Sequence, residues 1–216
     1  MKLIHRLYQP LFRVWRERRH AQFVAELPVG ANETLLDVGG YWWNWTAYPQ
    51  TAARIDCLNP VAAPFAADAH PQHRIRALLG SGCAIPAGAG EYAVAYSNSV
   101  IEHVGSWAEQ QAFAREIRRV GRAVWVQTPA YGCLIEPHFL APAVHWLPEW
   151  CRAWVCRYLT PRGWIEGPHS PEMEELLQTT RLLTKREMRQ LFPDCEIRVE
   201  RLFGLWPKSY IAIRRG

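Results

Sequence analysis

The stretch LLDVGGYWWNW, residues 35–45, decides the fold. It begins with a short apolar run that carries one acid, Asp37, and it continues at once into Gly39 and Gly40. Such a run predicts a buried strand of a parallel sheet. Glycine allows a positive φ and a close approach of the backbone to a ligand. In open α/β sheets ligands bind beyond the carboxyl ends of the strands, where a turn of this kind would lie. Taken alone, the stretch is equally compatible with a plain strand and turn that carry a stray acid.

Strands and connections alternate after this stretch. Besides 34–38, strands are expected at 53–58, 74–79, 92–96 and 122–127. This alternation predicts a parallel sheet with right-handed crossovers. Ser106 is a suitable N-cap for a helix, and Thr184 with Glu187 forms a capping box for another. Two final apolar runs, 196–202 and 209–213, lie too close together for a crossover and predict an antiparallel pair. The expected fold class is therefore α/β, with a Rossmann-like sheet of seven strands.

The chain is expected to form one domain, residues 1–216, with two additions. Residues 1–28 form a basic amphipathic helical arm, in which Pro10 should break or kink the helix. Residues 1–20 contain six basic residues and one acidic residue, so they account for the whole net charge of +5. Residues 131–180, rich in Pro, His and Trp, are expected to form a lid inserted after the fifth strand. Glu149–Tyr158 is predicted to be a helix of this lid.

Cysteine usage and hydropathy suggest a cytoplasmic protein. The six cysteines show no C-x-x-C pair and are expected to be reduced thiols. No apolar run approaches the roughly 18 residues that a membrane span requires. The basic arm could still touch an anionic membrane, and a solvated helix face is the alternative interpretation of its charge.

Six segments, in this order, carry a resemblance to a known family. They are LLDVGG (35–40), RIDCLNP (54–60), GSGCAIP (80–86), EYAVAYSNSVIEHV (91–104), EIRRVGRAVWVQTP (116–129) and TKREMRQLFPDCEI (184–197). Together they resemble the class I S-adenosylmethionine-dependent methyltransferases, in particular the small type 11 enzymes of bacteria. The resemblance covers roughly residues 30–130 and 180–214. It implies the seven-stranded methyltransferase sheet and S-adenosyl-L-methionine as the cofactor.

The resemblance also implies where the cofactor binds. The residues at the matching positions are Asp37, Gly39, Gly40, Asn59, Ser81, Gly82, Cys83, Ser97 and Asn98. Three positions depart from the family pattern, because Asn59, Ser81 and Ala93 stand where acids are usual. Tyr41, Trp42 and Trp43 are bulky where small residues are common. The adjacent glycine pair does not form the G-x-G-x-x-G pattern that a nicotinamide enzyme would show.

Candidate catalytic residues follow the fourth and fifth strands. His138, Glu136 and His103 are predicted to be catalytic, since a neutral histidine can take a proton from an acceptor. Alternatively, the lid histidines bond to the backbone, and His103 only begins a helix. No metal is predicted, although Glu102 and these three residues are of types that can bind a metal ion. Methyl transfer depends mainly on positioning, so a good nucleophile needs no base.

The expected function is methyl transfer to a hydroxyl, or in second place an amine, of a small or lipid-linked metabolite. The partners expected are a small-molecule or lipid-like acceptor and, through residues 1–20, an anionic membrane. The lid tryptophans 146, 150, 154 and 164 are expected either in a core or in the wall of a hydrophobic acceptor pocket. The alternative function is a non-catalytic binding module of the same fold with a weakened cofactor site. Nucleic acid is not expected, because the chain beyond the arm is neutral and Ser97–Val100 lacks the signature of base amino methylation.

Overall fold

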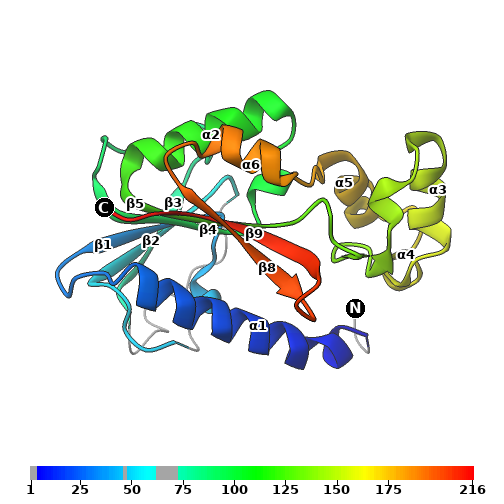
Figure 1. Cartoon of the computed structure of the whole chain (residues 1–216), viewed down its shortest axis with the longest axis horizontal. Helices are drawn as coiled ribbons and strands as arrows, with labels where there is room; N and C mark the ends of the chain where they lie inside the picture. Colours follow the sequence, from blue (N-terminus) through cyan, green and yellow to red (C-terminus); the bar gives the residue numbers. More distant parts are fainter. Residues whose placement is uncertain (1–3, 46–47, 62–72) are drawn as a thin grey trace.

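Seven strands form one sheet at the centre of the molecule (Figure 1). The computed structural model describes residues 4–45, 48–61 and 73–216, with side chains from residue 14 onward. The order across the sheet is β3-β2-β1-β4-β5-β9-β8. The strands are β1 (Thr34–Val38), β2 (Arg54–Asn59), β3 (Ile75–Leu79), β4 (Tyr92–Asn98), β5 (Gly121–Pro129), β8 (Glu196–Leu202) and β9 (Trp206–Arg214). β1 to β5 are parallel, and β9 runs antiparallel between β5 and β8. The predicted fold class is confirmed.

Helix α1 (Ile4–Glu26) covers one face of the sheet. Its anchor is Phe23, which is fully buried and packs edge-on against the rings of Tyr96 and Trp125, with centroid distances of 4.9 and 5.5 Å. The break expected at Pro10 is wrong, since α1 is one uninterrupted helix (Figure 1). Residues 1–3, and the side chains of residues 4–13, lie outside the described part of the chain. The predicted basic arm is therefore described mainly by the backbone of α1.

Helices α2 (Trp107–Val120) and α6 (Lys185–Leu191) cover the opposite face. Both begin with the predicted caps. Ser106 and Glu109 form a full capping box at α2, and Thr184 and Glu187 form one at α6. Phe113 of α2 is buried in the core beneath them. Because strand side chains alternate between faces, these helices and α1 bury different halves of each strand.

The lid follows β5 and has a small core of its own. It contains β6 (Ile135–Glu136), β7 (Ala141–Pro142), η3 (Val144–Trp146), α3 (Glu149–Tyr158), α4 (Pro161–Glu166) and α5 (Pro171–Thr179). Phe139, Cys156 and Met173 are buried together within it. The α3 bounds match the prediction, whereas the β6–β7 pair and α4 were not anticipated.

In the described part of the chain, no helix combines the length and apolar character needed to cross a bilayer. The six cysteines are free thiols. Their state agrees with the prediction that they do not form disulfides.

Candidate functional site

The turn after β1 is held by a buried carboxyl group. Asp37 is 2% exposed, and its Oδ2 accepts a hydrogen bond of 2.8 Å from the indole Nε1 of Trp45. Burial raises the pKa of Asp37 to about 7, and the bond from Trp45 acts in the opposite direction. Trp45 is the C-cap of η1 (Trp42–Asn44) and the last residue of the aromatic run, so the run closes back onto the strand that precedes it.

Both glycines of the turn are required by its geometry. Gly39 has φ +78°, and a Cβ there would lie 2.5 Å from Cγ2 of Val100. A Cβ on Gly40 would lie 1.7 Å from Oδ2 of Asp37. The side chain of Asn59, at the end of β2, donates a hydrogen bond of 2.5 Å from Nδ2 to the Gly40 carbonyl. Asp37, Gly39, Gly40 and Asn59, four of the predicted cofactor residues, are thus brought together.

The bulky residues of the turn stack on one another. The rings of Tyr41 and Trp43 are parallel with centroids 4.4 Å apart, and Trp42 contacts Trp43 edge-on at 5.7 Å. The indole Nε1 of Trp42 is buried and has no hydrogen-bond partner among the residues that the structure describes. A buried donor without a partner is costly, so this atom marks a place where a ligand could accept a hydrogen bond.

The remaining predicted cofactor residues support neighbouring segments. Ser81 is exposed and its Oγ accepts from the Cys83 backbone N–H, while a Cβ on Gly82 would strike the Phe113 ring at 2.6 Å. Ser97 is fully buried and donates to the Val38 carbonyl at 3.0 Å. Asn98 accepts from Arg19 at 2.8 Å and lines a different cavity, described below.

Four acidic and imidazole side chains meet beyond β4 and β5. Glu102, in η2 (Ile101–His103), is fully buried, and its Oε2 accepts from the Thr128 hydroxyl at 2.9 Å. His138 Nδ1 lies 2.6 Å from Oε1 of Glu136, and its Nε2 lies 3.9 Å from Oε1 of Glu102. The ring of His103 is perpendicular to that of His138, with centroids 4.7 Å apart. All three residues predicted to be catalytic therefore lie in one cluster.

Electrostatics differ between the two histidines of this cluster. Burial raises the pKa of Glu102. Burial also opposes the charged form of His138, but the bond to Glu136 and the charges of Glu136 and Glu102 raise its pKa above the ordinary value. Burial, together with the charge of His138, lowers the pKa of His103 to about 4. The cluster therefore keeps His103 neutral at physiological pH.

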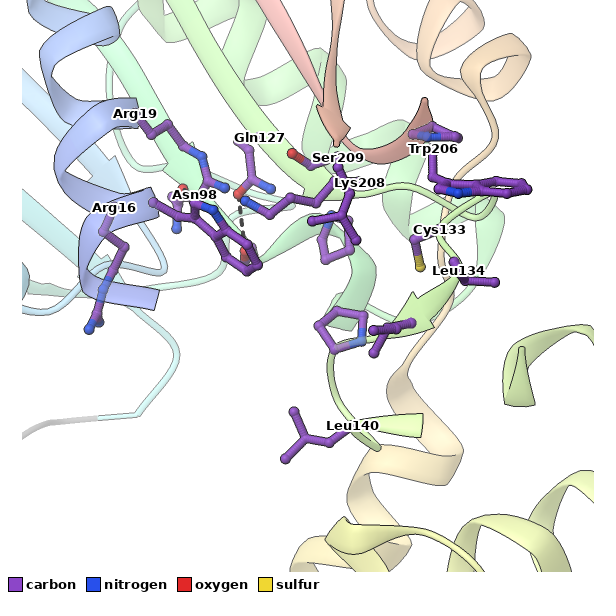
Figure 2. A pocket seen from close by; sticks show the side chains of 17 residues that line it. Arg16, Arg19, Asn98, Gln127, Cys133, Leu134, Leu140, Trp206, Lys208 and Ser209 are labelled. Carbon is purple, nitrogen blue, oxygen red and sulfur yellow. Dashed lines mark hydrogen bonds between the residues drawn. The ribbon is translucent and has the colours of Figure 1, made fainter. Parts of the chain in front are cut away.

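A cavity of about 450 Å³ opens at the carboxyl ends of β4 and β5 (Figure 2). Its wall is largely apolar and comes from α1, from residues 133–140 and from the β8–β9 hairpin. Its cations are Arg16, Lys208 and Arg19, the last of which is paired with Glu200 and Asn98. Lys208 Nζ lies 3.7 Å from the centroid of the Trp15 ring and 3.9 Å from Glu200, and burial lowers its pKa to about 8.

The lid tryptophans do not line this cavity. Trp15 and Trp206 do so instead. Trp150, Trp154 and Trp164 are 85%, 56% and 67% exposed, and Trp146 is 45% exposed. The expectation of a core is therefore wrong for these four residues, and none of them forms a wall of this cavity. Trp150, Trp154 and Tyr158 are spaced by four residues on α3, so they form an exposed aromatic stripe.

Sequence reasoning missed several polar residues of the site. In the sequence, Thr128 directly follows the strand expected at 122–127 and Arg19 lies in the basic arm, and neither position indicates a role in the site. Lys208 and Glu200 lie on the terminal hairpin, about 180 residues from α1 in sequence. No local pattern indicates that these residues meet. His145, a further lid histidine, bonds the Tyr131 carbonyl at 2.8 Å, as the structural alternative expected.

The chain was compared with known proteins. It matches no protein-family model and no curated protein. Magnesium protoporphyrin IX methyltransferase from Synechocystis PCC 6803, solved with bound S-adenosylhomocysteine, is similar over 99% of this chain and 88% of that one, with TM-score 0.58 and 10% identity. The 1,6-didemethyltoxoflavin-N1-methyltransferase of Burkholderia thailandensis is similar over 95% of this chain and 82% of that one, with TM-score 0.57 and 13% identity.

A third structure, a SAM-dependent methyltransferase from Anabaena variabilis ATCC 29413, is similar over 95% of this chain and 84% of that one, with TM-score 0.54 and 16% identity. The chain therefore has the fold of the class I S-adenosylmethionine-dependent methyltransferases, as the six sequence segments indicated. At these identities the likeness defines the fold, and the chemistry has to be argued from the site.

The buried Asp37 carboxyl predicts a specific pH dependence of stability. Its pKa is raised on folding, so between pH 4 and pH 7 the unfolded chain loses a proton that the folded chain keeps, and stability falls as pH rises through this window. Asp37→Asn retains an oxygen acceptor for Trp45 and removes this effect. We expect the free energy of unfolding of the variant, relative to the unmodified protein, to rise by roughly 1–4 kcal/mol between pH 4.5 and pH 8. If chemical denaturation shows that the free energies of unfolding of both proteins change with pH in the same way across this range, the raised pKa of Asp37 is contradicted.

Proposed function

We propose that the protein is an enzyme that transfers a methyl group from S-adenosylmethionine to a hydroxyl, or in second place an amine, of a small or lipid-linked acceptor. The observation that carries the proposal is that one short segment, residues 99–100, both contacts the glycine turn and lines the apolar cavity. Gly39 packs against Val100, and the preceding residue, Ser99, lines the cavity. A donor held at the turn and an acceptor held in the cavity would thus lie next to the same segment.

The residues of the turn fit the amino-acid end of this cofactor. Gly39 and Gly40 allow a ligand to approach the backbone closely, and the Asp37 carboxylate can accept from a ligand ammonium group. The unpartnered Nε1 of Trp42 offers a hydrogen bond to a ligand oxygen. When bound, the cofactor supplies an electrophilic methyl group on sulfur. The protein's own contribution is to orient the two reactants and exclude water.

One observation favours the alternative, a non-catalytic module of the same fold. The Asn59 amide and the Asp37 carboxyl already have partners within the protein, Gly40 and Trp45. A site whose polar groups bond to one another has less to offer a ligand. The two functions differ in whether the turn binds the cofactor at all.

Calorimetric titration with S-adenosylhomocysteine separates the two functions. We expect saturable binding by the unmodified protein and a loss of at least tenfold in affinity for Gly40→Ala, because its Cβ displaces the Asp37 carboxyl. Asp37→Ala should abolish binding. Gly88→Ala is the matched control, since its new Cβ meets only the end of the Glu91 side chain at 3.5 Å. No heat and no thermal stabilisation at millimolar ligand would exclude the enzyme and leave the binding module.

The cavity supports an acceptor with an apolar body and an anionic group. A largely apolar wall of this size suits an alkyl or ring system. Arg16 also lines the cavity, while Arg19 and Lys208 carry two positive charges beside the single charge of Glu200, so the polar end of the cavity has a positive excess. Figure 2 shows both cations directed toward Asn98 and Gln127 at the ends of β4 and β5. A phosphate or carboxylate on the acceptor would balance that excess.

Simple amphiphiles test this acceptor class. Decyl phosphate should bind in calorimetry or thermal-shift titration, and Lys208→Met should weaken it about tenfold because one charge-assisted contact is lost. The affinity for decanol, which has the same alkyl chain and no charge, should be unaffected by the substitution. Lys185→Met, at the start of α6, is the control. If Lys208→Met weakens the binding of both ligands equally, or of neither ligand, a cationic recognition site is contradicted.

We further propose that the protein contacts a membrane surface through the lid and the arm. The exposed aromatic stripe of α3 provides side chains of the kind that partition into the lipid interface. The arm provides positive charge for anionic headgroups. The N-terminal end of α1 and the lid helices lie at the same end of the molecule (Figure 1). Such contact would place the cavity near a lipid-linked acceptor.

Vesicle co-sedimentation tests this contact. The protein should bind vesicles that mix phosphatidylglycerol with phosphatidylcholine, and the double substitution Trp150→Ser and Trp154→Ser should reduce binding several-fold. Leu79→Ser, 68% exposed on β3 at the opposite edge of the sheet, is the control and should change nothing. Absence of binding, or equal binding by all three proteins, would exclude a role for the lid in membrane contact.

A further inference from the structure

Three side chains of the buried cluster present ligand atoms to one point. One ligand atom each from Glu102, His103 and His138 lies within 4.8 Å of the others. Glu102 and His103 come from η2 after β4, whereas His138 comes from the lid after β6. The sheet therefore fixes two ligands, and the lid brings the third.

An unpartnered oxygen of Glu102 is aimed into this cluster. Its Oε2 accepts from Thr128, but its Oε1 is buried and has no hydrogen-bond partner among the described residues. Nε2 of His138, at 3.9 Å, is beyond hydrogen-bond distance. A buried carboxylate oxygen left without a donor is costly. Coordination to a cation would satisfy it.

His138 is oriented as a metal ligand by a neighbouring carboxylate. Glu136, which is 1% exposed, lies 2.6 Å from Nδ1 through Oε1, and its own Oε2 accepts from the Phe139 backbone N–H at 2.7 Å. A carboxylate that binds one ring nitrogen fixes the tautomer and turns the other nitrogen toward a metal. Here the nitrogen left is Nε2, which faces Glu102.

We propose that Glu102, His103 and His138 bind a divalent first-row transition ion, with zinc as the reference case. Two imidazoles and one carboxylate form a donor set typical of Zn²⁺, Co²⁺ or Fe²⁺, whereas Mg²⁺ and Ca²⁺ prefer oxygen ligands throughout. Coordination bonds of about 2.0–2.2 Å require the three side chains to close in slightly.

Three protein ligands leave room for at least one more. If the proposed methyl transfer is correct, an acceptor hydroxyl could take this position and lose its proton more readily as a metal ligand. Ser99 and Pro137, next to the ligand segments in the chain, line the acceptor cavity. The binding of the ion itself does not depend on this role.

Metal binding is tested on chelator-treated protein without a histidine tag. We expect one Zn²⁺ per chain in calorimetry, and a Co²⁺ absorption spectrum that lacks the intense near-ultraviolet band of thiolate ligation. Glu102→Gln, which keeps an acceptor for Thr128, and His138→Gln should each weaken binding at least 100-fold. Glu136→Gln should weaken it by about 10–100-fold, because it removes only the orienting carboxylate. His169→Gln, on an exposed lid histidine bonded to Tyr158, should have no effect.

Three results would overturn the proposal. The first is that the unmodified protein binds neither Zn²⁺ nor Co²⁺ at 0.1 mM metal, about ten times a working protein concentration of roughly 10 µM. The second is that the Glu102 and His138 substitutions leave metal binding unchanged. The third is a thiolate band in the Co²⁺ spectrum. The first would indicate that a protonated His138 pairs with the two carboxylates instead. The Co²⁺ spectrum needs no variant, so a variant that fails to fold does not remove the test. S-adenosylhomocysteine binding, measured on the same metal-free protein, reports separately on the proposed function.

Discussion

The buried carboxyl group of Asp37 is the interaction on which the carboxyl edge of the sheet depends. It accepts from Trp45, which brings the aromatic run back over β1, and it occupies the space that any side chain at position 40 would need. The Gly40 carbonyl in turn accepts from Asn59 and so connects the turn to β2. One acid thereby requires glycine at position 40 and fixes the path of the chain after β1.

The parts of the fold that the sequence predicts are those governed by local periodicity and capping. Largely apolar runs of five to seven residues predicted the strands of the sheet, and the capping residues at Ser106 and Thr184 predicted the starts of α2 and α6. The lid was only partly predictable, because its two-residue strands and the six-residue α4 are too short to show a period. The continuity of α1 through Pro10 was missed because packing against the sheet can outweigh the cost of a proline.

The same distinction holds for the site: residues marked by local sequence were predicted, and contacts between distant segments were not. Residue type and position after a strand were enough to select Glu136, His138 and His103, and the sheet does bring them together. Contacts between Arg19, Asn98 and Glu200 join the first helix to the fourth and eighth strands, and nothing in the local sequence encodes such distant pairing. For the lid tryptophans, the sequence predicted contacts that the structure does not have. Their apolar character suggested burial, but the lid core is already filled by smaller residues such as Cys156 and Met173.

The cost of Asp37 bears on whether the turn serves a ligand. A carboxyl group buried in a central strand lowers stability at neutral pH, and the hydrogen bond from Trp45 only partly offsets that cost. Replacing both members of such a pair with apolar groups of similar shape is often neutral or stabilising. Without a ligand at this edge, the acid holds the turn at the cost that its burial imposes. An ammonium group bound at the turn would offset that cost, since it favours the ionised carboxylate that folding disfavours. Similar reasoning applies to Glu102, whose buried Oε1 has no hydrogen-bond partner among the described residues and lies 3.9 Å from Nε2 of His138.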